Sequence, residues 1–304
     1  MKFASKLFNK LKYLTMIVLV TTVVSCDSWL DLGSEDRIME NTLFSSQAGF
    51  MTALNGVYIE LLNSSLYGGT LSYKTFDILA QYYDCDKDEQ TWQKLSTFDQ
   101  TAKKGQVSGL WSKVYTLLVN VNTIIEACDE RKEVLNSEYY HVIKGEALAL
   151  RGLMIDDFKA AEELLKDYDP VIKKGALWGD EGPGLPNDMV YRSLRLNYYA
   201  VKAYIARLAL YTGDKATALM YARQVIKETQ EDNNWFPFVT RAAATTLSKW
   251  DRVYKTEILF GLYNLKRSDV YESTFSNKLG EKVILRPTDA NIESLYEEDT
   301  RVNG

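Results

Sequence analysis

The sequence has 304 residues and a formal net charge of −5, with 36 lysine and arginine residues against 41 acidic ones. An acidic balance argues against binding to nucleic acid and against electrostatic adhesion to anionic lipid. Three cysteines and one histidine leave little material for a disulfide framework or a zinc site, so we predict neither a metal nor another cofactor.

The first 25 residues have the pattern of a bacterial lipoprotein signal peptide. Four lysines and no acidic residue accompany an apolar run over residues 13–24, which is shorter than the roughly 20 residues that span a bilayer as a helix. Val23-Val24-Ser25-Cys26 resembles the lipobox, in which the cysteine is acylated and becomes the new N-terminus. We predict removal of residues 1–25 and a stable lipid anchor on Cys26. The alternative is a plain secretory signal that leaves Cys26 unmodified.

Removal of the signal peptide makes the chain more acidic. It takes away four lysines and leaves 279 residues with 32 basic against 41 acidic side chains, a net charge of −9. Cys85 and Cys128 are then the cysteines besides the anchor, and their spacing does not decide whether they pair.

Two helices and a long loop are expected after the anchor. Ser45 and Ser46 precede residues 47–62, whose apolar side chains recur at three- and four-residue steps, as in a capped amphipathic helix. Residues 72–84 are expected to form a second, shorter helix. Residues 85–106 are polar and lack a clear period, so we expect a long loop, a feature that is often functional.

Helical periodicity dominates the middle of the chain, where we predict helices over residues 109–130, 137–165, 190–211 and 215–230. Gly213 and Asp214 join the last two helices, the glycine as a C-cap and the aspartate as an N-cap. Residues 173–188 are rich in Gly and Pro and are expected to form a loop. Residues 257–264 are expected to be a buried strand or extended segment, followed by an irregular tail.

The helix pair at residues 195–226 resembles a tetratricopeptide helical hairpin. Ala203, Ala218 and Ala222 would let two antiparallel helices approach closely, and Tyr198 would fill the gap to a neighbouring pair. A generic α-hairpin would also fit so degenerate a pattern. Two long helices upstream that could pair in the same way favour the tetratricopeptide-like interpretation.

Five segments in the same order resemble the SusD/RagB family of nutrient-capturing surface lipoproteins from Bacteroidota. They are "SCDSWLDL", "TLFSSQAGFMTALNGVYIELL", "WSKVYTLLVNVNTIIEAC", "KGEALALRG" and "YYAVKAYIARLALYTGDKATALMYARQVI". The matching positions include Asn55, Gly56, Tyr58, Trp111, Tyr115, Asn122, Gly145, Glu146, Arg151, Gly213 and Asp214.

The resemblance implies a predominantly all-α fold, a superhelix of tetratricopeptide-like helical hairpins with an irregular, loop-rich lobe. We expect a signal peptide over residues 1–25, a lipid-anchored segment over residues 26–44 and a helical domain over residues 45–304. Since members of the family generally continue further, this domain is expected to be incomplete at its C-terminus. Residues 152–165 also lack the Tyr-Gly-x-x-Pro sequence common in the family.

The resemblance also implies a function without catalysis. A member of this family sits on the outer membrane as a hinged lid over a TonB-dependent transporter, captures glycans or peptides, and delivers them to the transporter. Two other functions stay open for this chain. One is an all-α polysaccharide-degrading enzyme at the same surface, and the other is a periplasmic helical-repeat adaptor lipoprotein.

Aromatic side chains beside the predicted loops are the candidates for ligand binding, since glycans are gripped by rings that stack on sugar faces. The candidates are Tyr82, Tyr83, Asp84, Trp92 and, more weakly, Trp178. Packing between helices is the alternative for all four aromatic residues. It is the preferred interpretation for Trp111 and Trp235.

The acidic residues of the chain favour structural roles. Asp84, Asp86 and Asp88 alternate as in a calcium loop, but the glycine and glutamate that would complete an EF-hand are absent, so a solvated acidic loop is preferred to a looser calcium site. Asp156-Asp157 and Glu162-Glu163 are adjacent on a helix and point about 100° apart, so neither pair can flank one glycosidic bond. Glu146 and Arg151 are expected to tie helices together.

Overall fold

The structure is a computed structural model that describes residues 35–85, 91–155, 157–175, 189–245, 253–280 and 284–297. Two compact units are present, residues 1–45 and residues 46–304. Within the described ranges the first unit contains helix α2 (Glu35–Leu43), and the other helices belong to the second unit. The signal peptide and Cys26 lie outside the described residues.

The described part of the chain is all-α, as the sequence predicted. The second unit contains α3 (Gln47–Leu61), α4 (Thr75–Leu79), α5 (Thr91–Ser96), α6 (Gln100–Glu130), α7 (Ser137–Ile155), α8 (Phe158–Leu165), α9 (Val171–Lys174), α10 (Tyr198–Tyr211), α11 (Lys215–Ile226), α12 (Arg241–Thr245), α13 (Arg267–Thr274) and α14 (Asp289–Glu297). Short turns η1 (Lys132–Val134), η3 (Arg192–Leu194) and η4 (Lys227–Glu231) complete the list. Extended pairing in the described ranges is limited to one isolated bridge, between Tyr83 and Pro287.

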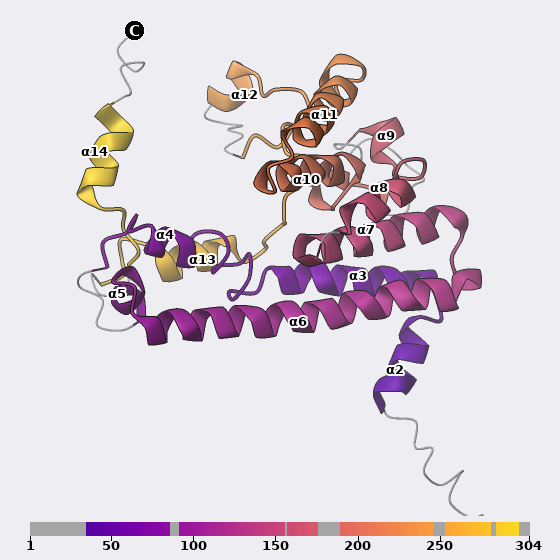
Figure 1. Cartoon of the computed structure of the whole chain (residues 1–304), viewed down its shortest axis with the longest axis horizontal. Coiled ribbons are helices and arrows are strands. Elements are labelled where there is room, and N and C mark those ends of the chain that lie inside the picture. The colour runs from indigo at the N-terminus through magenta and orange to yellow at the C-terminus, as the bar shows by residue number, and fades with distance from the viewer. Residues whose placement is uncertain are drawn as a thin grey trace, which may run out of the picture. The chain divides into compact units, whose positions relative to one another are not determined.

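Helix α3 begins where its cap predicted. The Ser46 hydroxyl accepts a hydrogen bond from the Gly49 N–H at 3.2 Å, which satisfies one of the free donors of the first turn. One apolar face of the helix is buried, including Phe50, Leu54 and Val57. This face packs against α6 and α7, and Figure 1 shows α3 lying along α6.

The long loop predicted over residues 85–106 is wrong for most of its length. Helix α5 occupies part of it, and α6 begins at Gln100 rather than at Gly109. Asp99 is the N-cap of α6, because its carboxylate accepts the Ala102 N–H at 2.8 Å. Residues 86–90 lie outside the described residues. Helix α6 therefore has 31 residues and ends at Glu130, as predicted.

The single helix predicted over residues 137–165 is two helices, α7 and α8, which pack against each other. Glycines in α7 allow this close approach. A Cβ atom at Gly145 would lie 2.7 Å from Leu165 Cγ, and one at Gly152 would lie 2.8 Å from the Phe158 ring. A larger residue at either position would have to displace a buried side chain, so the close packing of α7 and α8 depends on glycine at both.

The predicted hairpin near the end of the helical stack is confirmed, with a later start. Helix α10 begins at Tyr198 rather than at residue 190, and Asn197 is its N-cap. Gly213 adopts φ +86° in the turn, and the Asp214 carboxylate accepts the Thr217 N–H at 3.0 Å. Consecutive helices pack in the order α6, α7, α8, α10, α11 (Figure 1), which is the arrangement of stacked helical hairpins.

Three further predictions about elements need correction. The helix expected over residues 72–84 is reduced to α4, because the chain leaves the helix at Gln81 (φ +57°) and Asp84 N–H donates to the Arg286 carbonyl. The helix expected to reach residue 230 ends as α11 at Ile226 and continues as the π-type turn η4. The tail predicted to be irregular contains α13 and α14.

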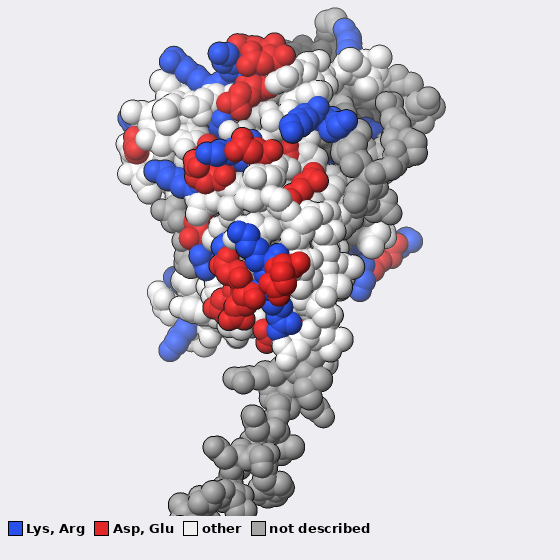
Figure 2. Space-filling model, turned by 90° about the vertical axis from the view of Figure 1, so that its right-hand side faces the viewer, with Lys and Arg blue, Asp and Glu red and all other residues white. Residues whose placement is uncertain are grey.

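The described surface carries charges of both signs. On the face drawn in Figure 2, Lys and Arg side chains lie next to Asp and Glu side chains and form no continuous basic stripe.

Cys85 and Cys128 are buried thiols that form no disulfide with each other. Burial raises the pKa of the Cys128 thiol to about 12, so its reactive thiolate form is scarce at neutral pH. In a chain that carries Cys26→Ser, we expect neither thiol to react quickly with a water-soluble disulfide reagent in native buffer and both to react in denaturant. Rapid labelling of the native chain would contradict this burial.

Candidate functional site

Three of the aromatic residues predicted to bind ligand lie together in the structure. Tyr83 belongs to a cluster of buried side chains that includes Ile78, Cys85, Leu95 and Leu285. Tyr82 and Trp92 are half-buried and pack against this cluster. The rings of Tyr82 and Tyr83 meet edge to face, with centroids 5.3 Å apart. These contacts join the end of α4 to α5 through packed rings.

The environment of Tyr83 is that of a packing residue. Its side chain is 7% exposed, and its hydroxyl donates to the Tyr73 carbonyl oxygen at 3.0 Å. Burial raises the pKa of Tyr83 to about 12. Asp84 is exposed, and Lys74 Nζ lies 5.8 Å from the centroid of the Trp92 ring. The structure thus favours the packing alternative for Tyr83, whereas ligand contact by Tyr82, Asp84 and Trp92 stays a prediction.

Two predicted features fall outside the described residues. Trp178 and most of the Gly- and Pro-rich loop lie in residues 176–188, and the acidic residues Asp86, Asp88 and Glu89 lie in residues 86–90. Within the described ranges, histidine, cysteine, aspartate and glutamate side chains nowhere gather in groups of three or more that could hold a metal ion.

Trp111 is exposed, contrary to the prediction that it packs in the core. It is 55% exposed and lies on α6 one turn before Tyr115, which is 61% exposed, and the two ring centroids are 5.8 Å apart. The apolar stripe of α6 is buried only further along, at Leu117 and Val121. Trp235 does pack, and its indole N–H donates to the Ile172 carbonyl at 3.2 Å.

The motif residue Glu146 is the centre of a buried ion network. Arg192 has no exposed surface and binds Glu146 at 2.5 Å and Asp169 at 2.9 Å. Arg195 binds the second oxygen of Glu146 at 3.0 Å, and the Tyr58 hydroxyl donates to the same oxygen at 2.8 Å. Burial alone would raise the pKa of Glu146, but the two guanidinium groups outweigh it and hold the pKa below its usual value.

This network gives the shared motifs a structural role, as predicted for Glu146 and Arg151. The Arg195 side chain also donates to Asn55 of α3, and Arg151 donates to Asn122 of α6 at 2.9 Å and to Asp157 at 2.5 Å. Motif residues from α3, α6 and α7 are therefore linked by charge-assisted hydrogen bonds, which are stronger than neutral ones.

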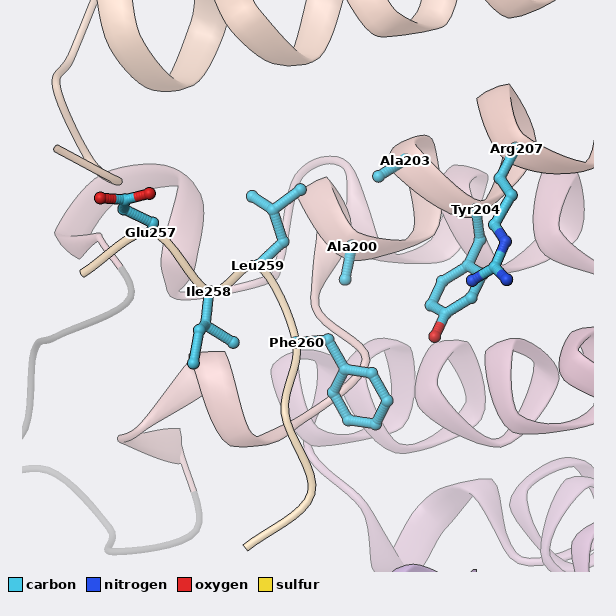
Figure 3. A pocket seen from close by; sticks show the side chains of 8 residues that line it. All are labelled: Ala200, Ala203, Tyr204, Arg207, Glu257, Ile258, Leu259 and Phe260. Atoms are coloured by element: carbon cyan, nitrogen blue, oxygen red, sulfur yellow. The ribbon is translucent and has the colours of Figure 1, made fainter. Parts of the chain in front are cut away.

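A pocket of about 420 Å³ lies between α10 and the irregular segment that follows α12. It is lined by Ala200, Ala203, Tyr204, Arg207, Glu257, Ile258, Leu259 and Phe260, all labelled in Figure 3. The two alanines leave room beside α10, and the three residues after Glu257 supply the facing apolar wall. Arg207 and Glu257 stand at opposite ends of the row of apolar side chains (Figure 3).

The wall opposite α10 is held by hydrogen bonds to the loop that precedes α10. The Asn197 amide donates to the Leu259 carbonyl at 2.7 Å, and the Gly261 N–H donates to the Ser193 carbonyl at 2.8 Å. The segment predicted over residues 257–264 as a buried strand or extended segment is non-helical and forms no strand in the described ranges. Its residues are half-buried or exposed, so the predicted burial is wrong. A tilted contact between the Phe260 and Tyr58 rings, 6.4 Å apart, ties this wall to α3.

Sequence reasoning missed this pocket, because its two walls are separated by some fifty positions in the chain. The apolar run at residues 257–264 and the small side chains of α10 were the available signals. Neither signal indicates which part of the chain these residues would face. Open, mostly apolar concavities with a few polar groups are the usual form of a small-ligand site.

The fold and the pocket define a class of protein, an all-α helical-hairpin scaffold with an open pocket beside α10. No family model matches the sequence. The chain is 23% identical over 144 residues to SusD-like protein P25 of Formosa agariphila, a match that covers 45% of this chain and 27% of the relative. A solved structure of a SusD superfamily protein from Bacteroides vulgatus is 18% identical and covers 65% of this chain and 46% of that one, with a TM-score of 0.45.

The sequence match, together with the order of the motifs, supports membership of the SusD/RagB family, as the sequence predicted. The matched region spans about a quarter of the length of the curated relative. Among the helices that the structure describes, every one is too short or too polar to serve as a transmembrane span.

Proposed function

We propose that this chain captures glycan or peptide nutrients at the surface of the outer membrane and delivers them to a TonB-dependent transporter. The observation that carries the proposal is the match of 144 residues to a SusD-like protein. It is supported by the buried network, in which the motif residues Tyr58 and Glu146 are parts of the scaffold. A rigid scaffold with variable loops suits a protein that presents a ligand to a partner.

The proposed anchor is a lipid on Cys26, since the signal peptide and lipobox place the cleavage site there. Wild type and Cys26→Ser should be expressed with their own leader in a Bacteroidota host, fractionated, and treated as intact cells with protease. We expect wild type in the outer-membrane fraction, acylated on its N-terminal peptide by mass spectrometry and cut by protease. The Cys26→Ser chain is expected to be soluble. A wild-type chain that is unacylated, or protected from protease, would contradict surface anchoring.

The proposed activity is binding without cleavage. Two of the carboxylates that might suggest a glycosidase are engaged in the scaffold, because Asp157 binds Arg151 and Glu162 accepts the Tyr221 hydroxyl at 2.8 Å. Affinity electrophoresis against a polysaccharide panel, run beside a reducing-end assay, tests this activity. We expect retardation by at least one polysaccharide, or binding of a peptide, with no new reducing ends. Release of reducing ends would favour the polysaccharide-degrading enzyme instead.

A further inference from the structure

The pocket beside α10 contains a positioned arginine without a carboxylate partner in the described ranges. The Arg207 Nε–H donates to the Tyr211 hydroxyl at 3.2 Å, and the guanidinium lies 5.4 Å from the centroid of the Tyr211 ring. Arg207 and Tyr211 are both exposed, and these contacts orient the guanidinium through one edge and one face. Its two terminal nitrogens remain available, and a guanidinium presents such nitrogens as a fork that matches a carboxylate.

The other end of the pocket is acidic. Glu257 is exposed and accepts the Val239 N–H through one carboxylate oxygen at 2.6 Å, which orients the group. Within the described residues it forms no ion pair with Lys or Arg. Its second oxygen can therefore accept from a cationic ligand group.

Between these two charges the pocket is apolar. Ala200, Ala203, Leu259 and Phe260 lie between Arg207 and Glu257 in the view of Figure 3. One face of the Tyr204 ring is already covered, because it stacks on Phe158 with centroids 5.4 Å apart. A neutral sugar could bond Arg207 and Glu257 through its hydroxyls but carries no charge to pair with either group. A ligand with two opposite charges and an apolar middle matches both ends of the lining and the wall between them.

We propose that this pocket binds a short peptide through its two termini. The C-terminal carboxylate pairs with the Arg207 guanidinium, the N-terminal ammonium faces Glu257, and apolar side chains of the peptide lie against Leu259 and Phe260. The inference rests on the proposed capture function and names the ligand class of this pocket. Glycans, if they are bound, bind elsewhere on the chain.

The probe is the tripeptide Leu-Ala-Leu, titrated by calorimetry into the mature chain with Cys26→Ser, beside its C-terminally amidated form and its N-acetylated form. Arg207→Gln is expected to weaken binding of the free peptide by roughly tenfold or more, since a charge-assisted pair is lost. Amidation is expected to weaken binding to wild type by a similar factor and to cause little further loss in Arg207→Gln. Arg223→Gln, an exposed arginine on α11 outside the pocket, is the matched control and is expected to bind as wild type does.

A second variant tests the other end. Glu257→Gln is expected to weaken binding of the free peptide and to leave that of the N-acetylated peptide unchanged. Equal binding by wild type, Arg207→Gln and Glu257→Gln would overturn the proposal, because the peptide would then bind elsewhere. Binding of polysaccharide but of no peptide would overturn it while leaving the proposed function intact. Binding of neither class of ligand would contradict both.

Discussion

Replacement of Arg192 by methionine is expected to lower the free energy of unfolding by about 3–5 kcal/mol, the usual effect of breaking a buried ion pair from one side. Arg192 is fully buried and lies between Glu146 and Asp169, which are also buried. Its loss leaves Asp169 with only its bonds to the backbone N–H groups of Val171 and Tyr198. Since whole domains are stable by roughly 5–15 kcal/mol, the change is a large fraction of the total.

The measurement is urea denaturation of the mature chain with Cys26→Ser, with and without Arg192→Met. Arg223→Met, at an exposed position of α11, serves as the control and is expected to change stability by less than about 0.5 kcal/mol. A loss below about 1 kcal/mol for Arg192→Met would show that the network contributes little beyond what a packed apolar side chain supplies.

The same network links stability to acid pH. Because the pKa of Glu146 is lower in the folded chain than its ordinary value, its contribution is present above the unfolded pKa, near 4.5, and is lost as pH falls through the folded value. The wild type is therefore expected to lose stability below about pH 4.5. Arg192→Met, which lacks one of the two partner charges of Glu146, is expected to show a shallower loss over the same range.

Helix ends with local signals could be predicted from the sequence, and helix ends set by distant contacts could not. Ser46, Gly213 and Asp214 act within one turn of their own position, so the start of α3 and the turn between α10 and α11 were correct. The same kind of signal at Asp99 was overlooked, because the first residues of α6 are mostly polar, lack a clear apolar period and include Gly105 and Gly109.

The break between α7 and α8 and the late start of α10 depend on tertiary contacts. No proline or glycine separates α7 from α8, so no local signal marks the break, and the two helices then pack with Gly145 against Leu165. Residues 190–197 carry helical periodicity but are held out of the helix, since Arg192 binds carboxylates 23 and 46 positions away. Pairings at such separations have no signature in a single sequence.

The candidate ligand-binding residues follow the same rule: neighbours in the chain could be predicted, and contacts between distant segments could not. The sequence identified Tyr82, Tyr83 and Trp92 as neighbours because they lie close in the chain, and it could not separate packing from binding, which depends on the coverage that Leu285 supplies. The pocket beside α10 depends on Leu259 reaching Asn197, a contact across 62 positions. Spacing alone cannot reveal such a site.

The second large effect on stability is expected at Asn197, the residue that donates to the Leu259 carbonyl. Asn197 has no exposed surface. Its side chain accepts the Ala200 N–H at 3.0 Å as the N-cap of α10, and its amide donates to the carbonyls of Arg192 at 2.9 Å and Leu259 at 2.7 Å. Asn197→Ala removes the cap, worth about 1 kcal/mol, and leaves two carbonyls without this donor at about 1 kcal/mol or more each. We expect a loss of about 2–4 kcal/mol in the free energy of unfolding, measured by urea denaturation.

Two further variants separate the roles of Asn197. Asn197→Ser keeps an oxygen that can cap α10 but loses the amide donor, so it is expected to recover about 1 kcal/mol relative to Asn197→Ala. Asn233→Ala, which removes an exposed amide bonded to the Glu228 carbonyl, is the control and is expected to have little effect. Because the amide fixes the Leu259 wall of the pocket, hydrogen exchange at Gly261 is expected to accelerate in both Asn197 variants and not in the control. Unchanged exchange would show that the wall is held by the remaining contacts, and that Asn197 acts on stability alone.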